Sequence, residues 1–223
     1  MSDLNPQAVL TGDIVASQEL SADALEQVRV VIEESILQIA QWSENLVPRP
    51  VDFSRGDAWQ CLLTDPGVAL RAALWVRSAL LYRCNVDTRV AVGIDTIEPL
   101  AANLSRSGGS AFVLSGRSLD ELHKRRLSIV LPTSSPFGPW LELSARLCDV
   151  IVSSWTQRQA ELMHAALAPE SLTQSAIAAS LQPPITKQAV GKALRAAHWD
   201  AISKAMDTFE ATDWVQLWKE SKS

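Results

Sequence analysis

Ala8-Val9-Leu10-Thr11-Gly12-Asp13-Ile14-Val15 is a short, mostly apolar run that carries one acidic residue near its end. Such a run predicts a buried β-strand with Asp13 displayed where the strand ends. A second acidic residue, Asp57, stands at the Gly-Asp tip of Phe53-Ser54-Arg55-Gly56-Asp57-Ala58-Trp59-Gln60, between two short apolar runs. Two such carboxylates, brought together, suit a hard cation such as Mg2+ (or Mn2+), which also takes oxygen ligands from phosphates. Strand-end and turn aspartates are also common for structural reasons alone, so both interpretations stay open.

Outward from these two runs, the hydrophobic pattern predicts alternating strands and helices. Ser21 is a candidate helix N-cap, and apolar residues recur at helical spacing from Leu25 to Ile39. The predicted elements are a strand at 8–15, a helix at 21–39, strands at 51–53 and 58–63, a helix at 68–82, a strand at 88–94, a short apolar segment at 111–114, a helix at 116–126 and a strand at 128–131. The order β-α-β-β-α-β is that of an α+β, ferredoxin-like domain.

The remainder of the chain has a different character. Thr133-Ser134-Ser135-Pro136-Phe137-Gly138-Pro139 is small, polar and punctuated by Pro and Gly, so we expect a linker at 133–140. Beyond it the pattern is helical throughout. We expect helices at 141–155, 156–167, 172–181 and 186–199, and a last one at 201–209 or continuing toward Trp218. The expected organisation is an α+β domain at 1–132 followed by an all-α domain at 141–223.

Composition limits the classes of protein to which the chain can belong. The net charge of −5 argues against wholesale electrostatic binding of nucleic acid but leaves room for a local basic patch. The three cysteines match no zinc spacing and indicate buried thiols in a reducing compartment. The first residues have no signal-peptide pattern, and no uncharged apolar run reaches the length of a membrane span. We therefore expect a cytoplasmic protein that does not enter the membrane.

Residues 173–194 show the pattern of a helix-turn-helix. Apolar residues would form the core shared by the two helices, Gln182-Pro183-Pro184 would form the turn, and Thr186 could cap the second helix. The window 173–199 holds three basic residues and no acidic one. The residues expected to contact DNA are Thr186, Lys187, Gln188, Lys192 and Arg195. Small helical bundles also produce this pattern by chance, and helix-turn-helix units also bind proteins.

Residues 8–131 resemble the class III nucleotide cyclase homology domain, in the divergent form of SatD-like bacterial proteins. The matching pieces are Thr11-Gly12-Asp13-Ile14-Val15-Ala16-Ser17, Arg55-Gly56-Asp57-Ala58-Trp59-Gln60, Arg89-Val90-Ala91-Val92-Gly93-Ile94 and Ser115-Gly116-Arg117-Ser118-Leu119-Asp120, in the family's order. The resemblance implies that Asp13 and Asp57 hold two metal ions against a triphosphate. It also implies that domains pair, so that sites form at a homodimer interface.

The chain departs from the family at three positions that recognise substrate. The family's Asn-x-x-x-Arg motif would fall at Val113 and Arg117, of which only Arg117 matches. Phe53 stands where a purine-recognising Lys is usual, and the position of that lysine's usual Asp partner falls near Arg106. Phe53 could stack on a base and Arg106 could contact one. Because cyclase chemistry depends on positioning and electrostatics, these losses favour a degenerate site that binds a nucleotide without turnover.

Three hypotheses follow from these patterns. The leading one is a DNA-binding transcriptional regulator whose cyclase-like domain senses a nucleotide or phosphate ligand with Mg2+ through Asp13 and Asp57, helped by Arg55 and Arg117. The second is an active, divergent nucleotide cyclase with Arg117 at the phosphates. The third is an interaction or assembly protein that binds neither nucleotide nor DNA.

Overall fold

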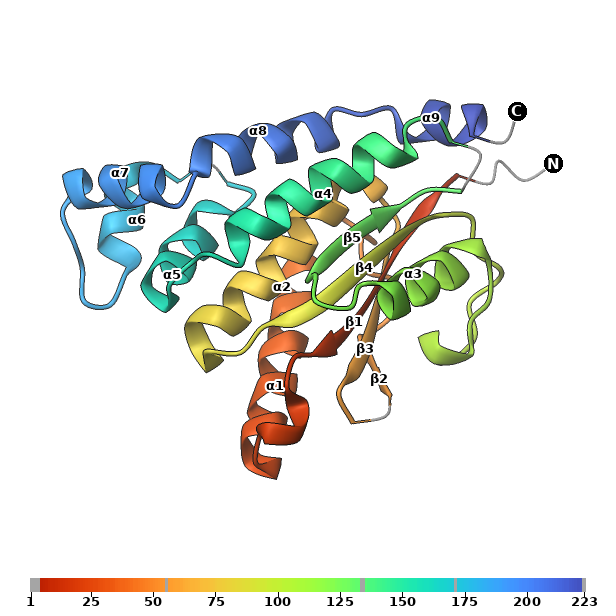
Figure 1. Ribbon diagram of the computed structural model, residues 1–223, viewed down its shortest axis with the longest axis horizontal. Helices are drawn as coiled ribbons and strands as arrows, with labels where there is room; N and C mark the ends of the chain where they lie inside the picture. Colours follow the sequence, from red (N-terminus) through yellow and green to blue (C-terminus); the bar gives the residue numbers. More distant parts are fainter. Residues whose placement is uncertain (1–4, 55, 133–134, 171, 222–223) are drawn as a thin grey trace.

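The computed structural model describes residues 5–54, 56–132, 135–170 and 172–221, and its centre is a five-stranded sheet (Figure 1). The strands are β1 (Gln7–Ile14), β2 (Asp52–Ser54), β3 (Ala58–Leu63), β4 (Thr88–Asp95) and β5 (Leu127–Val130). Their spatial order is β2-β3-β1-β4-β5, with β4 and β5 parallel and every other neighbouring pair antiparallel. With the helices α1 (Ala22–Ile39) and α2 (Ala69–Cys84), the predicted order β-α-β-β-α-β is present from β1 to β4. Strand β5 extends the sheet beyond β4.

Helices surround the sheet and make up the whole C-terminal part. They are α1 (Ala22–Ile39), α2 (Ala69–Cys84), α3 (Ser110–Glu121), α4 (Gly138–Val152), α5 (Gln157–Ala166), α6 (Gln174–Ser180), α7 (Lys187–Ala196), α8 (Trp199–Glu210) and α9 (Trp214–Glu220), with 3-10 turns η1 (Ser17–Glu19), η2 (Pro66–Val68) and η3 (Leu104–Arg106). Side-chain caps start several of them, as expected where the first N–H groups lack helical partners. Ser21 and Thr186, both predicted as caps, accept hydrogen bonds from the amides of Ala24 and Ala189.

Several boundaries differ from the sequence prediction. The helix predicted at 116–126 begins at Ser110, absorbs the apolar segment 111–114 and ends at Glu121. The reason is that Phe112, Ser115 and Leu119 share one buried face, so Gly116 lies within the helix and does not start it. Helix α4 begins at Gly138, so residues 138–140 of the predicted linker are helical. The helix predicted at 186–199 stops at Ala196, because the chain turns through His198, at φ 57°, before α8.

The two faces of the sheet are covered by different helices. Because successive strand residues point to opposite faces, Leu10 packs with α1 and α2, whereas Val9 packs with Ala111 and Phe112 of α3. The first of these clusters continues without interruption into α4, α5, α6, α7 and α8. The C-terminal helices therefore share a hydrophobic core with the sheet and its two long helices.

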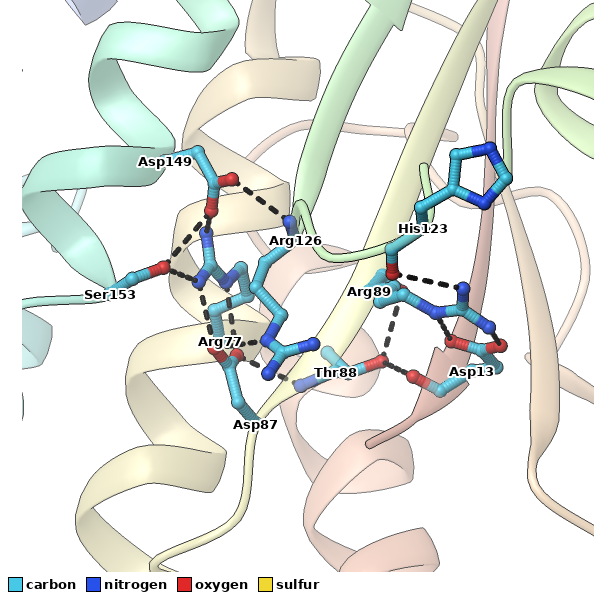
Figure 2. A network of polar contacts seen from close by, with 9 residues as sticks. All are labelled: Asp13, Arg77, Asp87, Thr88, Arg89, His123, Arg126, Asp149 and Ser153. Atoms are coloured by element: carbon cyan, nitrogen blue, oxygen red, sulfur yellow. Dashed lines mark hydrogen bonds and ion pairs between the residues drawn. The ribbon is translucent and has the colours of Figure 1, made fainter. Parts of the chain in front are cut away.

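A buried arginine joins these helices to the sheet (Figure 2). The Arg77 side chain of α2 is 0% exposed, and its guanidinium donates to both carboxylate oxygens of Asp87, at 3.0 and 2.8 Å. It also donates to Asp149 of α4, at 2.8 Å, and to Ser153 Oγ, at 3.1 Å. Burial lowers the pKa of Arg77, but the two carboxylates offset this and hold it above its usual value. The arginine therefore stays charged and fixes α4 to α2 and to the start of β4.

Three other buried side chains that can titrate, His164, Cys61 and Cys148, are uncharged at neutral pH. Burial lowers the pKa of His164 on α5 to about 4, so its imidazole is uncharged at neutral pH and packs against Trp75, with ring centroids 3.8 Å apart. Cys61 and Cys148 are buried thiols, as expected, and burial raises their pKa values to about 12 and 11. Among the described helices, none combines the length and the apolar character needed to span a bilayer.

Candidate functional site

The structure brings Asp13 and Asp57 to one polar cavity of about 390 Å³. The strand pairing explains why: Asp13 of β1 lies opposite Ala58 of β3, and the amide of Ile14 donates to the Asp57 carbonyl at 3.1 Å. The residues that line the cavity are Asp13, Ile14, Val15, Ala16, Ser17, Gln18, Glu19, Asp57, Arg89, His123 and Arg126. The cavity therefore brings three acidic residues, Asp13, Glu19 and Asp57, together with Arg89, Arg126 and His123.

The hairpin tip and the turn after β1 hold Asp57 in place. Gly56 has φ 91°, a conformation that L side chains rarely adopt, and its carbonyl accepts a hydrogen bond from Arg29 Nε at 2.9 Å. The Ser17 hydroxyl donates to the Asp57 carboxylate at 2.6 Å. One carboxylate oxygen of Asp57 therefore has a fixed partner within the protein.

Asp13 is paired with Arg89 of β4, the residue opposite it in the antiparallel β1–β4 register. Arg89 Nε donates to one carboxylate oxygen at 2.7 Å and Nη2 donates to the other (Figure 2). Hydrogen bonding to Asp13 raises the pKa of Arg89, while partial burial opposes the shift. A cation that bound Asp13 would therefore share the carboxylate with Arg89 or displace it.

Contacts of Trp59 with Gly12 and Thr88 fix the backbone beside Asp13. The indole of Trp59 lies over Gly12 so closely that a Cβ on residue 12 would fall 2.4 Å from Trp59 Cε2. The indole N–H donates to Thr88 Oγ1 at 3.0 Å, and the Thr88 hydroxyl donates to the Asp13 carbonyl at 2.6 Å. This cross-strand packing is possible because residue 12 is glycine, which has no side chain.

For a metal ion, the predicted ligands in this cavity are the carboxylates of Asp13 and Asp57. Among the described residues there is no group of three or more His, Cys, Asp and Glu side chains arranged as metal ligands. Mg2+ is nonetheless commonly held by one or two carboxylates, with water and phosphate oxygens supplying the rest. The donor set of Asp13 and Asp57 fits a magnesium ion that is bound together with a phosphate ligand.

The other predicted ligand-binding residues are spread over the molecule. Phe53 of β2 carries the Arg29 guanidinium over its ring, 5.7 Å from the centroid. Arg106 belongs to η3, which is tied to β2 by a hydrogen bond from the Ser105 amide to Asp52 at 2.9 Å. Arg55 lies outside the described residues.

Arg117 of α3 does not line the Asp13–Asp57 cavity. It lines a separate cavity of about 690 Å³, together with Val113, Glu98 and the start of α3. Within one copy of the chain, the candidate phosphate-binding Arg117 and the two aspartates therefore belong to different cavities.

Arg89 and Arg126 are site residues that the sequence interpretation missed. The signal for Arg89 was its position at the start of a predicted strand, but its partner Asp13 became evident only from the β1–β4 register. Arg126 follows the end of α3; its amide donates to Asp149 at 2.9 Å and its Nε lies 3.7 Å from Asp87. Arg126 therefore touches both the cavity and the Arg77 cluster.

The predicted DNA-contacting residues share the exposed side of α7. Lys187, Gln188, Lys192 and Arg195 are exposed, whereas Val190, Gly191 and Leu194 are buried against neighbouring helices. Thr186 is also exposed, but its hydroxyl caps the helix by accepting from the Ala189 amide at 3.1 Å. Helices α6 and α7 lie at the end of the molecule away from β2 (Figure 1).

Comparisons with known proteins concern the fold alone. No protein-family model and no curated protein sequence matches the chain. Among solved structures, the chain is similar to a bacterial light-regulated adenylyl cyclase, at 15% identity and a TM-score of 0.41, over 57% of this chain and 76% of that one. A second structure described in the same way gives 15% and 0.39, over 57% and 43%. The guanylyl cyclase Cya2 gives 14% and 0.35, over 52% and 70%. At these values the likeness says nothing about activity, metal or partners in this chain.

We expect Gly12→Ala to destabilise the protein by about 1–3 kcal/mol, because the added methyl group collides with Trp59. Gly116→Ala is the matched control: no atom lies within 4 Å of its added Cβ, and alanine favours a helix interior by up to about 1 kcal/mol. Urea unfolding of both variants measures the difference. Equal stabilities would show that the close contact of Trp59 with residue 12 is not a constraint.

Proposed function

We propose that this protein is a DNA-binding regulator whose Asp13–Asp57 cavity binds a nucleotide or related phosphate ligand together with Mg2+. The observation that carries the proposal is the convergence of both carboxylates with Arg89 and Arg126 on one cavity. Carboxylates alone would repel phosphate, and guanidinium groups alone would need no metal. Their combination suits a ligand that brings anionic oxygens and a divalent cation together.

Each side chain has a distinct role in this proposal. Asp13 and Asp57 would hold Mg2+, which supplies positive charge to the phosphate oxygens when bound. Arg89, released in part from Asp13, would donate to the phosphate, and Arg126 would add a second cation at the cavity wall. The Ser17–Asp57 hydrogen bond would keep one carboxylate oriented while the other exchanges partners.

We propose that residues 1–132 form a cyclase-homology domain of ferredoxin-like topology, which is the scaffold of this site. The strand order β2-β3-β1-β4 supports this assignment. Because Arg117 lines a different cavity from the aspartates, an active cyclase site would require a second copy to contribute Arg117. We therefore propose a homodimer, with ligand binding as the function of the single-chain cavity and turnover as the alternative that depends on dimerisation.

The DNA-binding part of the proposal rests on α6 and α7. The exposed cations Lys187, Lys192 and Arg195 occur in a window without acidic residues, on a helix whose opposite side is buried. Arg158 of α5 donates to the carbonyls of Gln182 and Pro183, at 2.9 and 2.8 Å, and so anchors the turn between the two helices. We propose that residues 174–196 form a helix-turn-helix that presents α7 to the major groove.

A continuous set of polar contacts could transmit the state of the cavity to the C-terminal helices. Asp13 contacts Thr88, the Thr88 amide donates to Asp87 at 2.8 Å, and Asp87 is paired with Arg77 (Figure 2). Arg77 in turn holds Asp149 of α4. We propose that ligand binding at Asp13 acts on the DNA-binding helices along this path, provided that the ligand prefers one of two arrangements.

For the ligand, we expect a thermal-shift titration with ATP, GTP and cyclic nucleotides to show a Mg2+-dependent rise in melting temperature. At a hundredfold excess over Kd the rise should be about 5 °C or more. Asp57→Asn should abolish the metal-dependent part, whereas Asp207→Asn, the same change at an exposed carboxylate of α8, should leave it intact. A shift that survives Asp57→Asn, or no shift with any nucleotide, would contradict the site.

For DNA, we expect fluorescence anisotropy with a labelled duplex of random sequence to show binding that weakens steeply with salt. Lys192→Ala and Arg195→Ala should each reduce the slope of log affinity against log salt by about 1, because each removes one phosphate contact. Arg146→Ala, an exposed cation on α4, is the control and should change nothing. Binding that is unaffected by both α7 substitutions would contradict the assignment.

A further inference from the structure

An open apolar cavity of about 360 Å³ lies between α4, α8 and the β5 edge of the sheet. Helices α4 and α8 run side by side above the sheet, and α9 lies at one end of them (Figure 1). The cavity shares no lining residue with the Asp13–Asp57 cavity. It is within the size range of small-molecule sites in proteins, roughly 300–1,000 Å³.

Large apolar side chains form both the base and the rim of this cavity. Leu131, Phe209 and Trp214 are buried. At the rim, Trp140 is 70% exposed and Phe137 is 44% exposed, so two aromatic rings face solvent beside an apolar hollow. Exposed apolar surface of this kind commonly marks a site of interaction.

The hydroxyl groups that line the cavity already donate hydrogen bonds to backbone carbonyls. Ser144 Oγ donates to the Trp140 carbonyl at 2.8 Å. Thr208 and Thr212 donate to the carbonyls of Lys204 and Thr208, both at 2.8 Å. The Trp214 indole N–H likewise donates to Phe209, at 2.9 Å. A neutral polar ligand that needs several hydrogen-bond donors therefore finds few of them here.

Lys204 is the charged side chain in the lining. Over the part of the chain that the structure describes, it forms no ion pair within 4.0 Å. The cavity thus combines a largely apolar lining with one exposed cation, Lys204. A ligand that matches both features has a single extended apolar body and one anionic head.

We propose that this cavity binds a free long-chain monocarboxylate, with the acyl chain between α4 and α8 and the carboxylate at Lys204. The site is separate from the Asp13–Asp57 cavity, and it adjoins α8, the helix that directly follows α7. Trp140 and Trp214 both line it and provide an optical signal of occupancy.

The test is a titration of the full-length protein with palmitate below its micelle concentration, followed by tryptophan fluorescence and by isothermal calorimetry. We expect saturable binding, and a signal change that is reduced in Trp140→Phe. Lys204→Gln should weaken the affinity for palmitate about fivefold, which corresponds to the loss of one exposed ion pair of about 1 kcal/mol. The affinity for methyl palmitate, which has no carboxylate, should not change. Lys124→Gln, a change at an exposed lysine outside the cavity lining, is the control, and Ala205→Phe should block the cavity for both ligands.

Several outcomes would overturn the proposal. One is the absence of palmitate binding to the folded protein at every ligand concentration up to the micelle concentration. Another is binding that neither Lys204→Gln nor Ala205→Phe weakens. A third is a fluorescence change that follows protein concentration in the absence of palmitate, which would show that Phe137 and Trp140 pack against a second copy instead. Binding to anionic phospholipid vesicles without binding to free palmitate would assign the surface to a membrane and also overturn it.

Discussion

The interaction on which the rest of the structure depends is the buried ion cluster of Arg77 with Asp87 and Asp149. A guanidinium removed from water is tolerated only where its charge and its donors are matched, and here two carboxylates and a serine match them. The three charged residues come from α2, from the turn before β4, and from α4. A single buried group therefore ties the sheet, one of its long helices and the first C-terminal helix together.

The Arg77 cluster is connected to both the Asp13–Asp57 cavity and the apolar cavity. On one side, Asp87 orients Thr88, whose hydroxyl reaches the Asp13 carbonyl, so the geometry of the Asp13–Asp57 cavity is connected to the cluster. On the other side, α4 is held against α2, and its outer surface forms one wall of the apolar cavity with α8. The cluster therefore connects to the Asp13–Asp57 cavity through Thr88 and holds α4, which lines the apolar cavity.

Part of this architecture could be predicted from the sequence, because it depends on local patterns. The strand 8–15, the Gly-Asp hairpin tip and the caps Ser21 and Thr186 each carry their own signal within a few residues. The meeting of Asp13 with Asp57 follows once a hairpin is placed beside the first strand. The metal role of these residues and the DNA role of α7 stay predictions.

What the sequence could not reveal depends on register and tertiary packing. Arg89 faces Asp13 only because β4 pairs with β1 in one particular antiparallel register. Arg77 stands in a helix with a broad apolar face, where an arginine would ordinarily be placed at the surface, and its burial depends on two aspartates 10 and 72 residues away. The place of Trp140 was not predicted either: its sequence position indicated the end of a linker, but it lies in the first turn of α4 with its side chain exposed.

The most direct test is the free energy of unfolding of Arg77→Met, compared with that of Arg83→Met, by urea denaturation. Arg83 also lies on α2 and pairs with Glu34, but both side chains are partly exposed. Removing Arg77 leaves carboxylates without their buried partner and should cost about 3–5 kcal/mol, whereas losing the Arg83 pair should cost less than about 1 kcal/mol. Losses below about 1 kcal/mol for both variants would contradict the central place of the Arg77 cluster.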